Sequence, residues 1–167
     1  MIERYTLPEM GAVWNQKNRF QKMLDVEIYA CEAMVYLGLI PREAFLEIKE
    51  KAGFELERIA EIEEITRHDV IAFLTAVGEK VGDASKYIHM GMTSSDVLDT
   101  GLSAQMKEAA ELLIARLRKL REVLAEKSRK YKYTLEVGRT HGIHAEPVTF
   151  GLKMALWTME VDRCIER

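Results

Sequence analysis

One apolar stripe constrains the fold of this chain more than any other feature. Apolar side chains recur every three or four residues, at Leu102, Met106, Ala109, Leu113, Leu117, Leu120 and Leu124. The steps cover 22 residues in six turns, about 3.67 residues per turn, which is typical of a single, nearly straight α-helix. We expect this helix over 95–130, roughly 50 Å long at about 1.5 Å per residue. Because one helix cannot bury its own apolar face, the stripe also predicts partner helices.

Shorter helices are predicted before the stripe, and one more long helix is predicted after it. Apolar spacing of three or four residues indicates helices over 18–37, 42–52, 55–65, 70–81 and 148–167. Asp69 is expected to cap the helix that begins at Val70, and 133–137 carries a minor strand signal. The predicted fold class is therefore all-α. Since the last helix keeps its apolar period up to Arg167, we expect either a fragment or one chain of an oligomeric bundle.

Charge and composition exclude several classes of protein. The 167 residues include 24 Lys and Arg against 27 Asp and Glu, with no basic block, so no nucleic-acid partner is expected. No apolar stretch is long enough to cross a bilayer and the N-terminus lacks a secretory signal, which predicts a cytoplasmic protein without a membrane partner. Cys31 and Cys164 fall at apolar helical positions and are expected to be reduced thiols in the core.

Three polar segments between the predicted helices, 66–69, 89–96 and 138–147, contain all four histidines of the chain: His68, His89, His141 and His144. Histidine titrates near neutral pH, so it suits proton transfer. In the first segment, Arg67 offers a guanidinium to an anion beside His68 and Asp69. An ordinary capped helix start explains the same three residues.

The second and third segments also combine polar groups with glycine. Thr93 and Ser94 precede a helix whose unpaired N–H groups attract a carboxylate or a phosphate, although a plain Ser/Asp cap fits equally well. In the third segment His141 lies beside Thr140 and Gly142, which suits an acid–base site, whereas His144 is more simply structural. No cysteine or carboxylate cluster completes a metal site, and glycine patterns for phosphate or dinucleotide binding are absent, so neither metal nor cofactor is expected.

Together these segments resemble the fumarase/aspartase superfamily, whose members eliminate fumarate from succinyl-containing substrates. The resemblance covers essentially the whole chain and rests on Arg4-Tyr5, Arg67-His68-Asp69-Val70, the 89–100 segment with Thr-Ser-Ser-Asp, and the Gly-Arg-Thr-His run of 138–147. Within the superfamily the chain is most similar to the adenylosuccinate-cleaving lyases of bacteria and archaea.

The resemblance implies a role for each matching residue. His141 would be the general acid that protonates the departing nitrogen, and His68 would assist it. The side chains that would bind a nucleotide substrate and its succinyl group are Arg4, Tyr5, Arg67, His68, Asp69, His89, Thr93, Ser94 and Thr140. No metal or organic cofactor is implied.

The resemblance also implies domains and partners. Residues 1–94 would form an N-terminal helical domain and 95–167 the start of a central bundle of long helices, in a homotetramer whose active sites are shared between subunits. The family's flexible loop that supplies a serine base has no match here, so we expect these 167 residues alone to be inactive. Two alternatives stay open: another fumarate-releasing lyase, similar to argininosuccinate lyase, and a non-catalytic helical scaffold.

Overall fold

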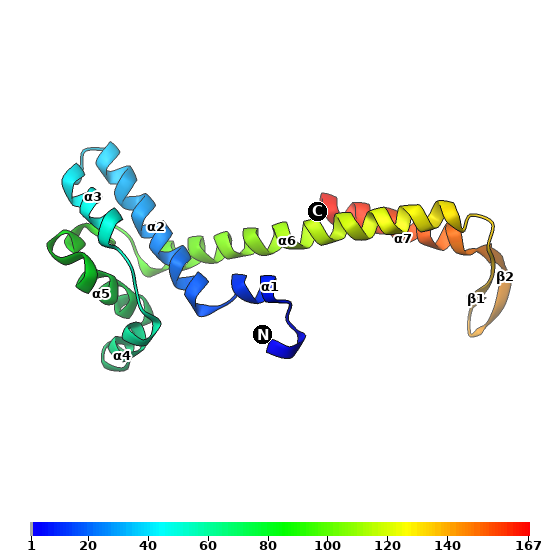
Figure 1. Cartoon of the computed structure of the whole chain (residues 1–167), viewed down its shortest axis with the longest axis horizontal. Helices are drawn as coiled ribbons and strands as arrows, with labels where there is room; N and C mark the ends of the chain where they lie inside the picture. The colour runs from blue at the N-terminus through cyan, green and yellow to red at the C-terminus, as the bar shows by residue number, and fades with distance from the viewer. Residues whose placement is uncertain (1) are drawn as a thin grey trace. The chain divides into compact units, whose positions relative to one another are not determined.

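The computed structural model describes residues 2–167 and is predominantly helical (Figure 1). The predicted all-α class is confirmed. The elements in chain order are η1 (Glu3–Tyr5), α1 (Pro8–Val13), α2 (Gln16–Tyr36), α3 (Arg42–Lys51), α4 (Leu56–Thr66), α5 (Asp69–Val81), η2 (Gly82–Tyr87), α6 (Ser94–Lys130), β1 (Leu135–Thr140), β2 (Ile143–Thr149) and α7 (Phe150–Glu166). Contacts divide the chain into two compact units, one ending at Ala109 and the other spanning Ala110–Arg167.

The core of the first unit is built on helices α2 to α5. Phe73 of α5 is completely buried and stacks on Phe20 of α2, with ring centroids 5.6 Å apart. Phe54, between α3 and α4, meets both rings at 5.9 and 6.2 Å. Cys31 of α2 is buried in the same core, as expected. The apolar residues of these helices therefore pack into one shared core. This packing fixes the helix ends between which the polar segments at 66–69 and 89–96 lie.

The expectation that Asp69 caps α5 is wrong. His68 holds the cap position in an extended conformation, and its Nδ1 accepts a hydrogen bond from the Ile71 N–H at 3.4 Å. Asp69 is the first residue of the helix, and its Oδ1 accepts from the Val70 N–H at 2.8 Å. A ring nitrogen in the cap position satisfies an N–H of the first turn as a hydroxyl or carboxylate would, so the sequence placed the cap one residue too late.

The second unit contains an antiparallel hairpin, which extends well beyond the predicted strand signal at 133–137. Strands β1 and β2 pair from Leu135 and Thr149 at the open end to Thr140 and Ile143 at the turn, with an irregularity between Val137 and Arg139. The hairpin therefore occupies the whole third polar segment, and α7 begins at Phe150 instead of Val148. The Thr149 hydroxyl caps α7 by accepting from the Leu152 N–H at 3.2 Å.

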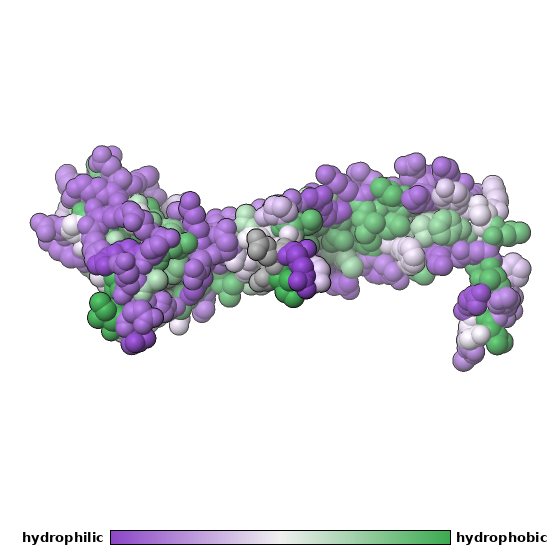
Figure 2. All heavy atoms as spheres, turned by 60° about the horizontal axis from the view of Figure 1, so that its bottom comes forward, coloured by the Kyte–Doolittle hydropathy of each residue, from purple (hydrophilic) through white to green (hydrophobic). Residues whose placement is uncertain are grey.

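Much of the apolar stripe on α6 is exposed. Ala109 and Leu124 are buried, but four large side chains are 47–57% exposed: Leu102, Met106, Leu113 and Leu120. Helix α7 exposes Leu152, Leu156, Trp157 and Met159 in the same way, and Figure 2 shows hydrophobic residues gathered along the helices of the second unit. Cys164 is also exposed, so its predicted place in the core is wrong. The second unit therefore leaves part of the apolar surface of α7 uncovered.

Candidate functional site

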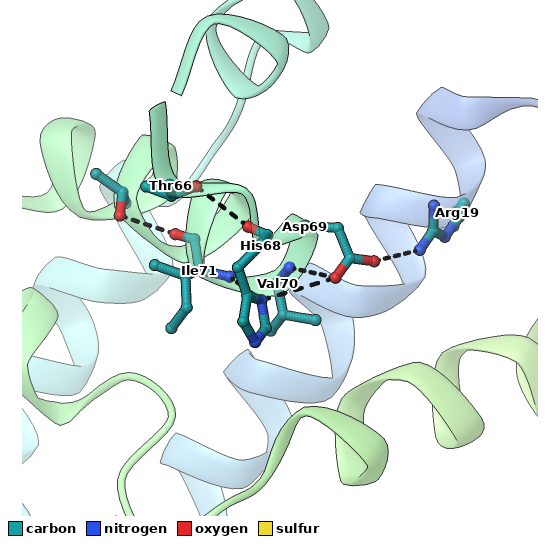
Figure 3. Close-up of polar contacts among 7 residues, drawn as sticks. Arg19, Thr66, His68, Asp69, Val70 and Ile71 are labelled. Carbon is teal, nitrogen blue, oxygen red and sulfur yellow. Dashed lines mark hydrogen bonds and ion pairs between the residues drawn. The ribbon is translucent and has the colours of Figure 1, made fainter. Parts of the chain in front are cut away.

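The first polar segment forms the tight connection between α4 and α5 (Figure 3). Arg67 ends α4 in the left-handed conformation, with φ of 53°, and its N–H donates to the Glu63 carbonyl at 2.8 Å. Its guanidinium is exposed and forms an ion pair with the equally exposed Glu64, at 3.0 Å. Since an exposed ion pair of this kind contributes little to stability, the Arg67 side chain remains available to an anion.

His68 and Asp69 follow on the first turn of α5. Because the Ile71 N–H donates to Nδ1 of His68, the neutral ring carries its proton on Nε2, and the side chain is about half exposed. The Asp69 carboxylate lies 3.8 Å from the same Nδ1 and accepts a hydrogen bond from Arg19 of α2 at 3.0 Å. Figure 3 shows Arg19 reaching Asp69 from the neighbouring helix. His68 therefore presents an N–H donor next to a carboxylate that is already oriented.

His89 lies in the loop between η2 and α6, and a buried carboxylate holds it. Its backbone N–H donates to Oε2 of Glu27 at 2.8 Å, and its Nδ1 lies 2.7 Å from Oε1 of the same side chain. Glu27 is 1% exposed, on the core face of α2. Sequence reasoning missed Glu27. The available signal was a carboxylate within the apolar period of that helix.

Thr93 and Ser94 lie at the N-terminus of α6, where helix N–H groups are unpaired. The Thr93 N–H donates to Oδ2 of Asp96 at 2.8 Å, and the Asp96 N–H donates back to the Thr93 carbonyl at 3.0 Å. Asp96 therefore serves as part of the helix cap, as the simpler interpretation of this segment expected. Thr93 is exposed and Ser94 half-buried, so both hydroxyls can still meet a ligand.

His141 lies at the tip of the hairpin in the second unit. Thr140 pairs with Ile143, which leaves a two-residue loop of His141 and Gly142 with φ of 51° and 76°. Positive φ at both positions is the requirement of a type I′ turn, the turn that matches the twist of a hairpin. Thr140, His141 and His144 are all exposed there. The fold thus projects His141 into solvent on a rigid two-stranded support.

Arg4 and Tyr5 belong to η1, at the start of the first unit. The Arg4 guanidinium lies over the Tyr5 ring, 4.8 Å from its centroid, and both side chains are exposed. A cation stacked on an aromatic ring leaves its N–H groups pointing outward, so the pair can bind an anion.

The left-handed conformation links three of the predicted site residues. Within residues 2–167, the non-glycine residues with positive φ are Arg67, His89 and His141, and each lies in a different polar segment. Such a conformation costs about 1–3 kcal/mol and persists where the surrounding structure imposes it, commonly at functional sites.

Within the first unit, two of the predicted histidines make no direct contact. No hydrogen bond or ion pair joins His68 to His89 in the part of the chain that the structure describes. A cavity of about 410 Å³ in the first unit is lined by Trp14, Arg19, Asp99 and Leu102 among others, and by none of the predicted site residues.

Neither a metal site nor a membrane-spanning helix is present among the described residues. No group of three or more His, Cys, Asp or Glu side chains is arranged to hold a metal ion among the side chains that the structure describes. Over the same residues, every helix is too short or too polar to span a membrane.

The chain is similar to known lyases along its whole length. A family model described as "Lyase" matches residues 3–167. Adenylosuccinate lyases of Bacillus subtilis and of Synechocystis sp. are 52% and 54% identical over 167 residues, which is 100% of this chain and 39% of each relative. The crystal structure of a fumarate lyase from Mesorhizobium sp. BNC1 matches with a TM-score of 0.89 and 30% identity, covering 95% of this chain and 38% of that one.

The chain thus spans about two fifths of the length of the relatives it matches. The polar segments that carry the resemblance all lie within the stretch that the family model covers. Because that stretch is nearly the whole chain, the chain belongs to the lyase family, the fumarase/aspartase superfamily whose motifs it carries.

Proposed function

We propose that the complete protein is an adenylosuccinate lyase of purine nucleotide biosynthesis. It releases fumarate from adenylosuccinate to give AMP, and from the succinylated aminoimidazole carboxamide ribotide to give the free ribotide. One observation carries the proposal: relatives of that name are more than 50% identical over the entire chain, which includes every candidate site residue. Their substrate is carried over to this protein as an inference.

The chemistry requires an acid, a base and cationic donors. Breaking a C–N bond β to a carboxylate needs a base for the carbon-bound proton and an acid for the departing nitrogen. It also needs positive donors for the negative charge that develops on the carboxylate. His141 is the proposed acid: it lies on an exposed turn held by two strands, so it can enter a site that other parts of the protein complete.

The remaining residues have proposed roles in binding. His68 assists His141 with the N–H that its cap interaction leaves on Nε2. Arg67 and Asp69 contact the substrate beside His68. The further residues proposed to bind the nucleotide or its succinyl group are Arg4, Tyr5, His89, Thr93, Ser94 and Thr140.

Further parts of the proposal concern the complete protein. The serine base belongs to a loop that has no match in these 167 residues, so the chain alone is proposed to be inactive. A homotetramer with shared active sites is proposed, because half-exposed Leu113 and Leu120 on α6 need helices to cover them. The proposed location is the cytoplasm.

The test measures fumarate release from adenylosuccinate by the complete protein. General acid catalysis contributes about 10² to 10⁴-fold, so His141→Gln should reduce kcat by that factor. His144→Gln is the matched control, since His144 is exposed on the same hairpin and should be dispensable. An active wild type with an unaffected His141→Gln variant would remove His141 from the role. A folded wild type that releases no fumarate from adenylosuccinate would refute the proposed substrate.

A further inference from the structure

Glu27 is a buried carboxylate, and the packing of the core does not by itself require a carboxylate at this position. It is 1% exposed on α2, and its neighbours at helical spacing, Met23, Leu24 and Cys31, are core residues. A carboxylate in such surroundings is unfavourable unless it is paired, and an apolar side chain of the same size generally suits a core better. Its presence therefore points to the group that it binds.

That group is His89, and the contact is double. Both carboxylate oxygens serve the one residue: Oε2 accepts the backbone N–H at 2.8 Å, and Oε1 lies 2.7 Å from Nδ1. His89 has a φ of 63°, a conformation that is strained for a residue with a side chain. The contact thus fixes the backbone and the ring of His89 together, across 62 residues of sequence.

The contact also determines which ring nitrogen remains available. A carboxylate is an acceptor only, so Nδ1 must carry a proton to bind Oε1. Nε2 makes no hydrogen bond to any side chain or backbone group that the structure describes. Over the same residues, no buried side-chain nitrogen or oxygen lacks a partner, so Nε2 is reached by solvent.

We propose that Glu27 is a positioning residue for the substrate-binding site. It keeps Nδ1 of His89 protonated and holds the ring so that Nε2 is the nitrogen that meets the nucleotide substrate. This inference rests on the proposed function, because it assumes that His89 contacts the substrate.

The decisive variant is Glu27→Gln in the complete protein. Glutamine has the same size, but it can accept from the His89 backbone N–H only if its NH₂ faces Nδ1. Nδ1 must then be unprotonated, so the variant reverses the ring's hydrogen-bonding pattern with little change in volume. A misoriented group in an active site can reduce the rate by about 10²-fold, and we expect kcat/KM for fumarate release to fall by that factor. Glu32→Gln, an exposed carboxylate on the same helix, is the matched control and should retain the wild-type value.

A double-mutant cycle distinguishes positioning from a general effect on the fold. If Glu27 acts through His89, Glu27→Gln should change kcat/KM less than about twofold in a His89→Gln background. Multiplicative losses in the double variant would overturn the proposal.

Proton NMR of the complete protein gives a second readout that does not depend on turnover. A hydrogen-bonded imidazole N–H should appear downfield in the wild type and vanish in His89→Gln and in Glu27→Gln. Its absence from the wild type would overturn the proposal, even if Glu27→Gln fails to fold. An inactive wild type that shows the resonance would refute the proposed substrate and leave the positioning contact supported.

Discussion

The carboxylate of Asp69 joins two helices: its Oδ2 accepts from Nη2 of Arg19 on α2 at 3.0 Å, while its Oδ1 accepts from the Val70 N–H on α5 at 2.8 Å. The side chains of Arg19 and Asp69 are each about 40% exposed. An ion pair at that exposure adds less than about 1 kcal/mol to stability. Its effect is to fix the orientation of the carboxylate next to His68.

Arg19→Gln should therefore affect the proposed reaction more than the fold. Loss of the guanidinium removes one of the two hydrogen bonds that orient Asp69, and we expect kcat/KM for fumarate release to fall roughly tenfold while the thermal midpoint changes little. Steady-state kinetics and a thermal melt of the complete protein test this. Arg42→Gln, on the exposed start of α3, is the control. Equal kinetics for the two variants would show that Asp69 needs no support from Arg19.

Gly151→Ala should destabilise the second unit. A Cβ at this position would lie 2.6 Å from the Ser128 carbonyl oxygen and 2.7 Å from Cα of Lys132, both of which are backbone atoms. The Gly151 N–H also donates to the Tyr131 carbonyl at 3.0 Å, so the backbone cannot move apart without breaking that bond. Overpacking of this kind costs about 1–3 kcal/mol, measurable by urea unfolding.

Gly11→Ala is the matched control for that measurement. Its added Cβ would meet only Thr6 Cγ2, at 3.5 Å, inside α1. Alanine is the better helix former, so this variant should be neutral or up to about 1 kcal/mol more stable. A Gly151→Ala variant as stable as wild type would mean that the turn after α6 can relax.

Cys31 should resist thiol reagents in the folded protein. Burial, and then the neighbouring Glu27 carboxylate, raise the pKa of the Cys31 thiol to about 11. At pH 8 only about one thiol in a thousand would be ionised, and the thiolate is the reactive form. Wild type and Cys31→Ala should therefore bind equal amounts of a disulfide reagent when native and differ by one equivalent in denaturant. A native difference of one equivalent at pH 8 would contradict the buried position.

Glu79 should contribute to stability at neutral pH and lose that contribution in acid. Arg58 of α4 donates to both oxygens of Glu79 on α5, at 2.9 and 2.7 Å, and this contact lowers the pKa of Glu79 below its ordinary value of 4.5. Because the folded-state pKa is the lower one, the stabilisation is complete above about pH 4.5 and disappears as pH falls through the lowered pKa.

Glu79→Gln tests this pH dependence. The variant should unfold at a lower temperature than wild type at pH 7, and the two midpoints should converge as the pH falls below about 4.5 and through the lowered pKa of Glu79. A gap that stays constant with pH would assign the effect to packing instead of charge.

The sequence predicted most of the helices because their apolar spacing reflects real burial. Phe20, Met23, Leu24 and Cys31 recur at helical intervals, and all are buried. The periodicity of α6 likewise predicted its extent to within one residue at the start, Ser94 instead of Ser95.

The hairpin was underestimated because its signals are short-range and atypical. Its turn is His-Gly where Asn-Gly is the usual signal, and its strands do not alternate regularly between apolar and polar residues. Cys164 was misplaced because an apolar period alone does not say whether a neighbouring element covers that face.

Residue types in the sequence were enough to predict the candidate site residues, but they did not predict the contacts that hold those residues in place. His68, His89 and His141 stand out as titratable residues in polar segments. Glu27 and Arg19 do not, because each is an ordinary helix residue whose partner lies 62 or 50 residues away. Such pairs are decided by tertiary packing, which a single sequence does not contain.

The His141–Gly142 turn places a double demand on one position. Its backbone accepts only residues that tolerate the left-handed region, chiefly Gly, Asn, Asp and His. Among these, only histidine exchanges a proton near neutral pH. The geometry of the loop and the proposed proton transfer therefore converge on the same amino acid. Asn is then the substitution that would remove the proposed proton donor and preserve the shape of the turn.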